Sequence, residues 1–331
     1  MLTKSMTLPA VYGSAAPKTN AADLRTMGYE IALSWKDGFK LVGKDFNYGV
    51  SASLGDYKTV ITKYNNPTKL LSDHYEGKVL GDIWGYVTYG LFQSDEEARE
   101  YSYYINDRNV SKGVYADKAP YNHLMAGDIM YLDINNDGVV NTGANTLEDS
   151  GDRIVIGNTK PRYNYSFRGD INWYGIDLSI FFQGVGKINW MPDSNCIYFW
   201  NNYSFSRPTF IPKDFAEKCW SDEKGADNSK ALFPRRRGML TNSSYLVASD
   251  YWIQDASYIR LKNLTVGYTL PLKTKAVDRV RFYFSGENLW YWSPMKKWTS
   301  VIDPEVATTN ASRDCVYPYS RTFSFGVDLT F

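Results

Sequence analysis

The last residues of the chain alternate strictly between apolar and polar side chains. Phe323, Phe325, Val327, Leu329 and Phe331 occupy one face of an extended segment, and small or polar residues occupy the other. Successive side chains of a β-strand point to opposite faces of the sheet, so this pattern predicts a strand with one apolar face. A soluble sandwich buries such a face, whereas a transmembrane barrel turns it towards lipid. The pattern alone fits both architectures.

Six further segments show the same alternation. The seven predicted strands cover residues 29–36, 46–56, 163–173, 176–187, 258–270, 279–290 and 321–331. The face opposite the apolar one carries charged and amide groups, which we expect to point into whatever the sheet encloses: Arg168, Asp170, Asp177, Gln183, Arg281, Glu287 and Asp328.

The connections between these segments alternate between short and long. Residues 37–45, 174–175 and 271–279 are short connections, and residues 55–162, 187–257 and 291–320 are long ones. Outer-membrane barrels have short periplasmic turns and long extracellular loops, and this regularity favours the membrane barrel. Aromatic residues also gather at strand ends, at 173–174 and 290–292, as they do at membrane interfaces.

Composition excludes several other classes. Lys and Arg number 37 against 36 Asp and Glu, so charge gives no reason to expect a nucleic-acid partner. Aromatic residues make up 16% of the 331 residues, which argues against disorder. No apolar run approaches the roughly 20 residues that a membrane helix requires. Only two histidines are present, which argues against a His-rich metal enzyme.

Seven strands do not make a complete bacterial barrel. Single-chain barrels have even numbers of strands, and open edges would leave backbone groups unpaired in hydrocarbon. Residues 1–9 also lack the charged start and apolar stretch of a secretion signal. We therefore expect residues 1–331 to form one part of a larger barrel, without a signal peptide.

One distinctive stretch is Tyr258-Ile-Arg-Leu-Lys-Asn-Leu-Thr-Val-Gly-Tyr-Thr-Leu-Pro271. Other stretches are Gly81-Asp-Ile-Trp-Gly-Tyr86, Gly90-Leu-Phe-Gln93, Gly127-Asp128, Asp133-Ile-Asn-Asn-Asp-Gly138, Gly157-Asn-Thr-Lys-Pro-Arg-Tyr163, Asp177-Leu-Ser-Ile-Phe-Phe-Gln-Gly184, Ser285-Gly-Glu-Asn-Leu-Trp290, Asp303-Pro-Glu305 and Tyr317-Pro-Tyr-Ser-Arg-Thr-Phe-Ser-Phe-Gly326. These stretches, in this order along the chain, closely resemble SusC/RagA-type TonB-dependent outer-membrane transporters.

The resemblance implies an all-β fold, in which this chain supplies about seven strands of a 22-stranded antiparallel transmembrane barrel. It implies uptake of oligosaccharides or peptides across the outer membrane, driven by the TonB complex, with a SusD-like lipoprotein lid. The plug domain and the remaining strands are not in this sequence, and the TonB complex would act through the missing N-terminal part. Lipid and the rest of the barrel are the other expected partners.

One loop has the spacing of a calcium site. Oxygen donors stand at the first, third, fifth and ninth positions of an EF-hand-like loop, a backbone carbonyl at the seventh, and glycine at the sixth. The residues are Asp133, Asn135, Asp137, Val139 and Asn141, and the family pattern adds Asp152. Glu148 and Asp149 are rival donors. A metal-free loop, in which Asn and Asp stabilise turns, explains the same residues.

Other features carry weaker indications. Aromatic residues in the long loops can stack on sugars or pack on each other: Tyr198, Trp200, Tyr203, Trp220, Tyr251 and Trp252.

Cys196 and Cys219 share one loop and are either paired or free, and Cys315 is left over. Arg235–Arg237 form a charge run that either lines a substrate path or is solvated. Ser94 and Glu97 have capping-box spacing and predict a short helix to about residue 106.

Two other functions remain open at this point. A secreted β-sandwich that binds carbohydrate explains the alternation and the aromatic residues, but not the connection lengths. A glycan-degrading enzyme is disfavoured, because no carboxylate pair has a spacing that marks an acid and a base. We predict no catalytic residues and no cofactor other than structural calcium.

Overall fold

The computed structural model describes residues 2–4, 18–101, 124–192, 215–235, 247–270, 272, 277–299, 302–307 and 319–331. Its main element is a seven-stranded sheet in the order β15-β14-β13-β10-β9-β4-β3, in which every neighbouring pair is antiparallel. The strands are β3 (Ala22–Leu41), β4 (Lys44–Tyr64), β9 (Arg162–Trp173), β10 (Ile176–Lys187), β13 (Tyr258–Leu270), β14 (Arg279–Trp292) and β15 (Thr322–Thr330). The all-β, antiparallel prediction with seven strands is confirmed.

Two of these strands extend well beyond their predicted ranges. β3 has 20 residues and β4 has 21, and their pairing continues as far as Ala22 opposite Tyr64. Polar residues occupy both faces of the added segment, so the side-chain alternation no longer signals a strand there. Backbone pairing between the two long strands nevertheless continues.

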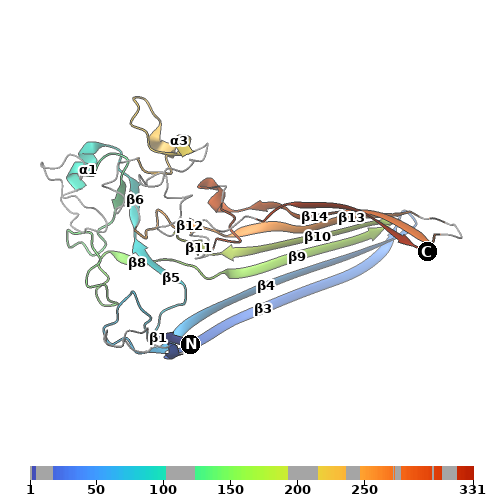
Figure 1. Ribbon diagram of the computed structural model, residues 1–331, viewed down its shortest axis with the longest axis horizontal. Coiled ribbons are helices and arrows are strands. Elements are labelled where there is room, and N and C mark those ends of the chain that lie inside the picture. Colours follow the sequence, from blue (N-terminus) through green and yellow to red (C-terminus); the bar gives the residue numbers. More distant parts are fainter. Residues whose placement is uncertain are drawn as a thin grey trace.

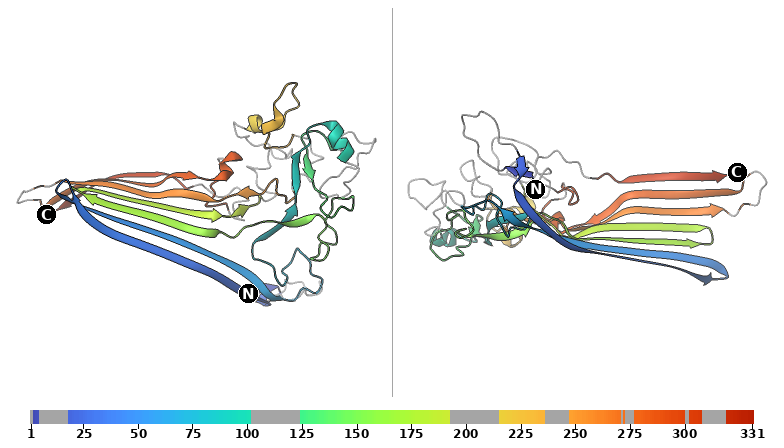
Figure 2. Two further views of the ribbon diagram at one scale, coloured as in Figure 1. Left: turned by 180° about the vertical axis from the view of Figure 1, so that it is seen from behind. Right: turned by 90° about the horizontal axis from the view of Figure 1, so that it is seen from below.

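The short connections lie at one end of the sheet and the long ones at the other (Figure 1). Val42 and Gly43 join β3 to β4 with φ values of 51° and 70°. Tyr174 and Gly175 join β9 to β10 with φ values of 49° and 84°. Two successive left-handed residues form the hairpin turn whose twist matches that of the strands, and glycine adopts this conformation without strain. The C-terminus lies at the same end as these turns (Figure 2).

The apolar face of the sheet is exposed rather than buried. The strand register places Leu33 opposite Ala52, Ala52 opposite Phe167, and Phe284 opposite Phe325, so apolar side chains form rows across the strands. Leu33 is 69% exposed and Phe325 is 83% exposed. A soluble sandwich would bury these rows, because contact between apolar side chains and water is unfavourable. The exposed apolar face is therefore suited to lipid.

The opposite face is polar and forms its own network. Arg281 donates to Asp177 at 2.6 Å and to Asp328 at 3.0 Å, which joins β14 to β10 and β15. Gly267 of β13 lies beneath this network, where a Cβ atom would overlap both Asp177 and the Arg281 guanidinium. The glycine therefore makes room for the ion pair to cross a strand.

The buried apolar core lies in the long connections. The strands there form three small pairs: β5 (Asp82–Tyr86) with β8 (Arg153–Asn158), β6 (Thr88–Leu91) with β7 (Ile129–Tyr131), and β11 (Asn189–Trp190) with β12 (Gln254–Asp255). The largest side chains with less than 2% exposure include Trp252, Tyr131, Phe92, Ile129, Met295 and Val140. We call this packed assembly of connections the loop cap. Burial raises the pKa of the Tyr131 hydroxyl within it.

The remaining elements are short. They are β1 (Leu2–Lys4) paired with β2 (Lys18–Asn20), helices α1 (Asp95–Tyr101) and α3 (Phe215–Lys218), and 3-10 turns η4 (Asn228–Lys230) and η6 (Pro294–Lys297). The predicted capping of α1 is present, since the Glu97 N–H donates to Ser94 Oγ at 3.1 Å. The predicted extension of this helix to residue 106 lies outside the described residues. Within the described ranges, no helix has the length and apolarity needed to cross a membrane.

Gly267→Ala should destabilise the sheet, because the added methyl group displaces the Asp177–Arg281 pair. We expect a loss of about 1–3 kcal/mol, seen as a lower unfolding temperature of the detergent-solubilised protein. Gly49→Ala is the matched control, because a Cβ atom there meets only ordinary contacts, the nearest at 3.5 Å. Equal unfolding temperatures for the two variants would show that Gly267 has no such role.

Candidate functional site

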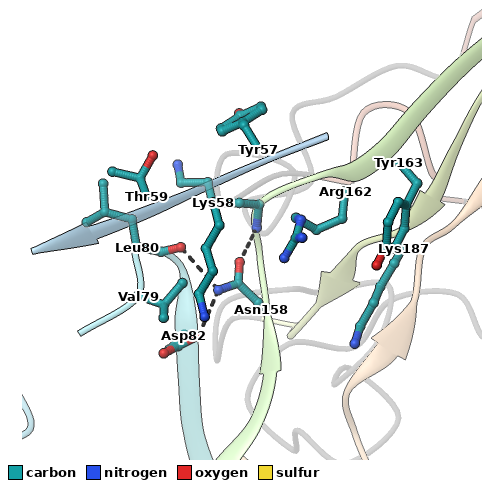
Figure 3. Close-up of a pocket in the computed structure, with 11 residues that line it drawn as sticks. Tyr57, Lys58, Thr59, Val79, Leu80, Asp82, Asn158, Arg162, Tyr163 and Lys187 are labelled. Atoms are coloured by element: carbon teal, nitrogen blue, oxygen red, sulfur yellow. Dashed lines mark hydrogen bonds between the residues drawn. The ribbon is translucent and has the colours of Figure 1, made fainter. Parts of the chain in front are cut away.

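A cavity of about 410 Å³ lies where β4 and β9 separate, at the end of the sheet next to the loop cap. The β4–β9 pairing ends at Gly55 opposite Asn164. Beyond that point β4 pairs instead with the segment before β5, as the Leu80 N–H donates to the Thr59 carbonyl at 2.9 Å. We call the resulting space the seam cavity. It is lined by Tyr57, Lys58, Thr59, Val79, Leu80, Asp82, Asn158, Lys160, Arg162, Tyr163 and Lys187 (Figure 3).

Asn158 fixes one wall of the seam cavity. Its amide donates to the Leu80 carbonyl at 3.1 Å and to Asp82 Oδ1 at 2.8 Å, and its oxygen accepts from the Lys160 N–H at 2.7 Å. Gly81, with φ of 92°, lets the two segments approach, since a Cβ atom there would overlap the Asn158 and Lys160 side chains. Two motifs from the sequence, 81–86 and 157–163, are thus brought together in this wall.

The charges around the seam cavity are mostly positive. Arg162 forms a bidentate ion pair with the buried Asp56 carboxylate. Lys58, Lys160 and Lys187 reach the cavity from three different segments, and their ammonium groups have no hydrogen-bond or ion-pair partner in the part of the chain that the structure describes. Asp82 is the only carboxylate in the described lining.

A second cavity, of about 470 Å³, adjoins the first and shares Tyr57 and Lys160 with it. We call it the cap cavity, because it lies between the sheet and the loop cap. Asn164 and Gln183 contribute amide groups from the polar face of β9 and β10, and the largely buried side chains of Trp190 and Tyr258 complete the lining. Together the two cavities combine aromatic, amide and cationic groups at the loop end of the sheet.

A buried ion-pair network closes the far side of the cap cavity. Arg260 is 1% exposed and contacts Asp303 through Nη2 and Glu305 through Nε at 2.9 Å. Lys262 adds a second ion pair to Glu305 at 2.7 Å. The Arg260 guanidinium also lies 4.7 Å from the ring of Tyr291. The 258–271 motif is therefore joined to the Asp303-Pro304-Glu305 motif, which holds the connection between β14 and β15 against β13.

Backbone N–H groups donate to most of the side-chain oxygens of the predicted calcium loop. Asp133 Oδ2 accepts from the Gly138 N–H at 2.8 Å, whereas Asp133 Oδ1 is buried with no hydrogen-bond partner among the described residues. Asn135 Oδ1 accepts from the Asp137 N–H at 2.9 Å, and Asp137 Oδ1 accepts from the Val139 N–H at 2.8 Å. The backbone therefore wraps around one side-chain oxygen that lacks a partner.

Asp152 closes this loop, and the rival donors are used elsewhere. Its two oxygens accept from the N–H groups of Ile134 and Asn141, each at 2.7 Å. Burial raises the pKa of the Asp152 carboxyl, against the effect of these hydrogen bonds. Glu148 pairs with Lys69, and Asp149 accepts from the Ala144 N–H at 2.9 Å. The loop has mixed carboxylate, amide and carbonyl donors, and no cluster of three His, Cys, Asp or Glu suited to a metal occurs among the described residues.

The predicted substrate-stacking aromatics need a correction. Trp252 is fully buried and Trp220 is buried, and both belong to the core of the loop cap. Tyr251 packs against that core and donates to the Leu232 carbonyl at 3.0 Å. The rings of Tyr251 and Trp252 lie 5.3 Å apart, and the two buried tryptophans present no ring face to a sugar. Tyr198, Trp200 and Tyr203 lie outside the described residues.

The cysteine and arginine predictions are tested only in part. Cys219 Sγ donates to the Pro234 carbonyl at 3.1 Å, and Cys196 and Cys315 lie outside the described residues. Pairing of Cys196 with Cys219 thus stays a prediction.

Arg235 contacts Asp222 and donates to the Ala126 carbonyl at 2.9 Å, so it holds the cap together. Arg236 and Arg237 are outside the described residues.

The cavities themselves were not predicted from the sequence. Lys58, Lys160 and Lys187 are far apart along the chain and follow no ligand-binding spacing. A signal was present in the motif 157–163, which carries two basic residues next to a proline, but nothing in the sequence placed Lys58 and Lys187 beside it.

Comparison with known proteins agrees with this fold. No family model matches the chain. TonB-dependent receptor P3 of Formosa agariphila is 24% identical over 356 residues, which covers 98% of this chain and 30% of that receptor. TonB-dependent receptor P26 of the same organism is 26% identical over 222 residues, which covers 62% of this chain and 20% of that receptor.

Solved structures show the same similarity. The RagAB peptide transporter matches with a TM-score of 0.61 and 19% identity, over 100% of this chain and 32% of that chain. The RagAB peptide importer in its closed-closed state matches with a TM-score of 0.60 and 17% identity, over 98% of this chain and 31% of that chain.

The chain thus spans about a third or less of the length of the proteins that it matches. It is similar over nearly its whole length to part of an outer-membrane TonB-dependent receptor of the SusC/RagA type, and the resemblance found in the sequence motifs is confirmed. These relatives are receptors and transporters rather than enzymes.

Arg260→Met should release the connection between β14 and β15, because it leaves the buried Asp303 without its partner and removes one of the two ion pairs of Glu305. Breaking a buried pair costs about 3–5 kcal/mol. We expect faster hydrogen exchange at residues 302–305, measured by mass spectrometry of the detergent-solubilised protein. Arg168→Met removes a pair whose side chains are 57% and 43% exposed, so it should change exchange little. Unchanged exchange at residues 302–305 in Arg260→Met would contradict the anchoring role.

Proposed function

We propose that this chain forms part of the pore wall and several extracellular loops of an outer-membrane nutrient importer. In this proposal residues 1–331 are one part of a single TonB-dependent receptor barrel, whose plug and other strands complete the pore. The cargo is an oligosaccharide or a peptide, a SusD-like lipoprotein covers the loops, and the TonB complex drives uptake. The observation that carries the proposal is a sheet with an exposed apolar face, a charged opposite face, and turns and loops segregated to opposite ends.

The secreted binding module is not supported by this arrangement. A carbohydrate-binding sandwich needs a second layer over its apolar face, and the described residues provide none over Leu33, Trp35 or Phe325. The similarity to a peptide transporter and to TonB-dependent receptors supports import as the activity of the whole protein.

The orientation of the sheet can be tested with spin labels at neighbouring positions of β15. Phe325 belongs to the apolar face and Ser324 to the polar face, and both are exposed. We expect a label at Phe325→Cys to be relaxed by oxygen dissolved in lipid, and a label at Ser324→Cys to be relaxed by a water-soluble nickel complex, because only the first faces hydrocarbon. The readout is power-saturation electron paramagnetic resonance on protein in bilayers. The reverse pattern, or equal accessibility to both reagents, would sink the proposal.

We further propose that the loop 133–141, closed by Asp152, binds calcium. The proposed ligands are Asp133, Asn135, Asp137, the Val139 carbonyl, Asn141 and Asp152, and the unpartnered Asp133 Oδ1 supports this assignment. The cation would neutralise the negative charges of the Asp133 and Asp152 carboxylates, and it would tie the two ends of the loop together.

Asp133→Asn should weaken calcium binding about tenfold or more, because calcium affinity follows the number of charged ligands. The measurement is calorimetric titration of calcium into the detergent-solubilised protein. Glu148→Gln is the control, since this exposed carboxylate pairs with Lys69 outside the loop. If the unsubstituted protein takes up no calcium, or if both variants bind it equally well, the assignment is wrong.

A further inference from the structure

The lining of the seam cavity carries more positive than negative charge. Asp82 is its only carboxylate among the described residues, and Arg162 is already paired with Asp56. The chain as a whole carries a net charge of only +1. Against that background, Lys58, Lys160 and Lys187 are exposed side chains that line one cavity, and they have no carboxylate partner among the described residues. Like charges held together repel each other, so an anion between them would be favoured.

The frame around these lysines is rigid. Asn158 is held by Leu80, Asp82 and Lys160, and its own N–H donates to Asn189 Oδ1 at 3.1 Å. Arg162 is held by the buried Asp56. The lysines therefore project from a fixed rim rather than from mobile loops, and a fixed rim lowers the entropic cost of binding.

The adjoining cap cavity indicates what the rest of the ligand is. It begins at Tyr57 and Lys160, where the seam cavity ends, and offers the amide groups of Asn164 and Gln183. The carboxylate nearest to it, Glu305, already pairs with Arg260 and Lys262 and does not offer a site for an amino group. Asp82 is the only carboxylate in the described lining of the two cavities that is not already in an ion pair. A ligand with several hydroxyl groups and more than one negative charge fits three lysines and two amides better than a short peptide, whose amino group would meet a single carboxylate among three ammonium groups.

We propose that the seam cavity and the cap cavity together bind an acidic oligosaccharide, whose carboxylate or sulfate groups are held by Lys58, Lys160 and Lys187. The proposal rests on the import function proposed above and names the cargo class for it. Uronate and sulfate groups share the chemistry that the lysines recognise, namely a compact anion with several acceptor oxygens. The amides of Asn164 and Gln183 accept and donate hydrogen bonds to the sugar hydroxyl groups.

The test is calorimetric binding to the full-length protein purified in detergent. The probes are a trimer of galacturonate, a sulfated trisaccharide, the neutral maltotriose and a tetraglutamate peptide. We expect the two acidic sugars to bind and maltotriose to bind at least about tenfold more weakly. The stronger of the two acidic sugars identifies the anion. Replacing Lys58, Lys160 and Lys187 together by Gln should weaken acidic sugar binding about tenfold or more, with a smaller dependence on salt.

A matched triple variant controls for the change in net charge. Lys40, Lys224 and Lys297 are exposed lysines elsewhere in the chain, and their replacement by Gln should leave binding unchanged. Equal binding of acidic and neutral sugars, or equal effects of the two triple variants, would overturn the proposal. Tighter binding of tetraglutamate than of either acidic sugar would overturn the cargo class and favour an acidic peptide. The spin-label experiment on β15 does not depend on these outcomes, so failure of the binding site and failure of the import function are distinguishable.

Discussion

The arrangement of this chain depends on the pairing of backbone groups across the sheet. In hydrocarbon an unpaired N–H or C=O costs several kcal/mol, so strands that cross a membrane must be paired on both sides. The five inner strands of the sheet satisfy this condition, from β14 through β4. The outer strands, β3 and β15, each have one described neighbour only. The proposed barrel follows from this constraint, since further strands on both sides would supply the missing partners.

Because the apolar face of the sheet is exposed, the buried core of the chain lies elsewhere. The loop cap packs Trp252, Phe92 and Tyr131 away from solvent and is tied to β13 by Arg260. This division explains why one chain can expose Phe325 at 83% and still bury Trp252 completely. It also gives the loops a fixed shape. Rigid loops can form a cavity against the end of the sheet, and the seam and cap cavities lie at that junction.

The sequence predicts the sheet well because a strand with one apolar face shows its extended backbone directly, as alternation between apolar and polar side chains. It predicts the ends of β3 and β4 poorly, because polar residues such as Lys58 and Thr59 follow each other where pairing continues. The loop 133–141, which we propose binds calcium, was recognisable from local spacing. The burial of Trp220 and Trp252 was not predictable from the sequence. An aromatic residue in a loop gives the same local pattern whether it packs against the protein or binds a ligand. Lys58, Lys160 and Lys187 come together only through the divergence of β4 and β9, which no local pattern encodes.

The two kinds of charge in the structure have different physical roles. Near the turns, Arg281 forms ion pairs with Asp177 and Asp328, which link β14 to β10 and β15 and help to hold the sheet in shape. Near the loops, the lysines of the seam cavity have no such partners in the described chain. At physiological salt the field of an exposed charge falls off over about 8 Å, so these lysines exert little attraction on distant anions. Their effect is strongest on a group that has entered the cavity, where water and salt screen them less. Such a site selects among ligands that have already entered the cavity and contributes little to capturing them from solution. In our proposal the lipoprotein lid captures the ligand.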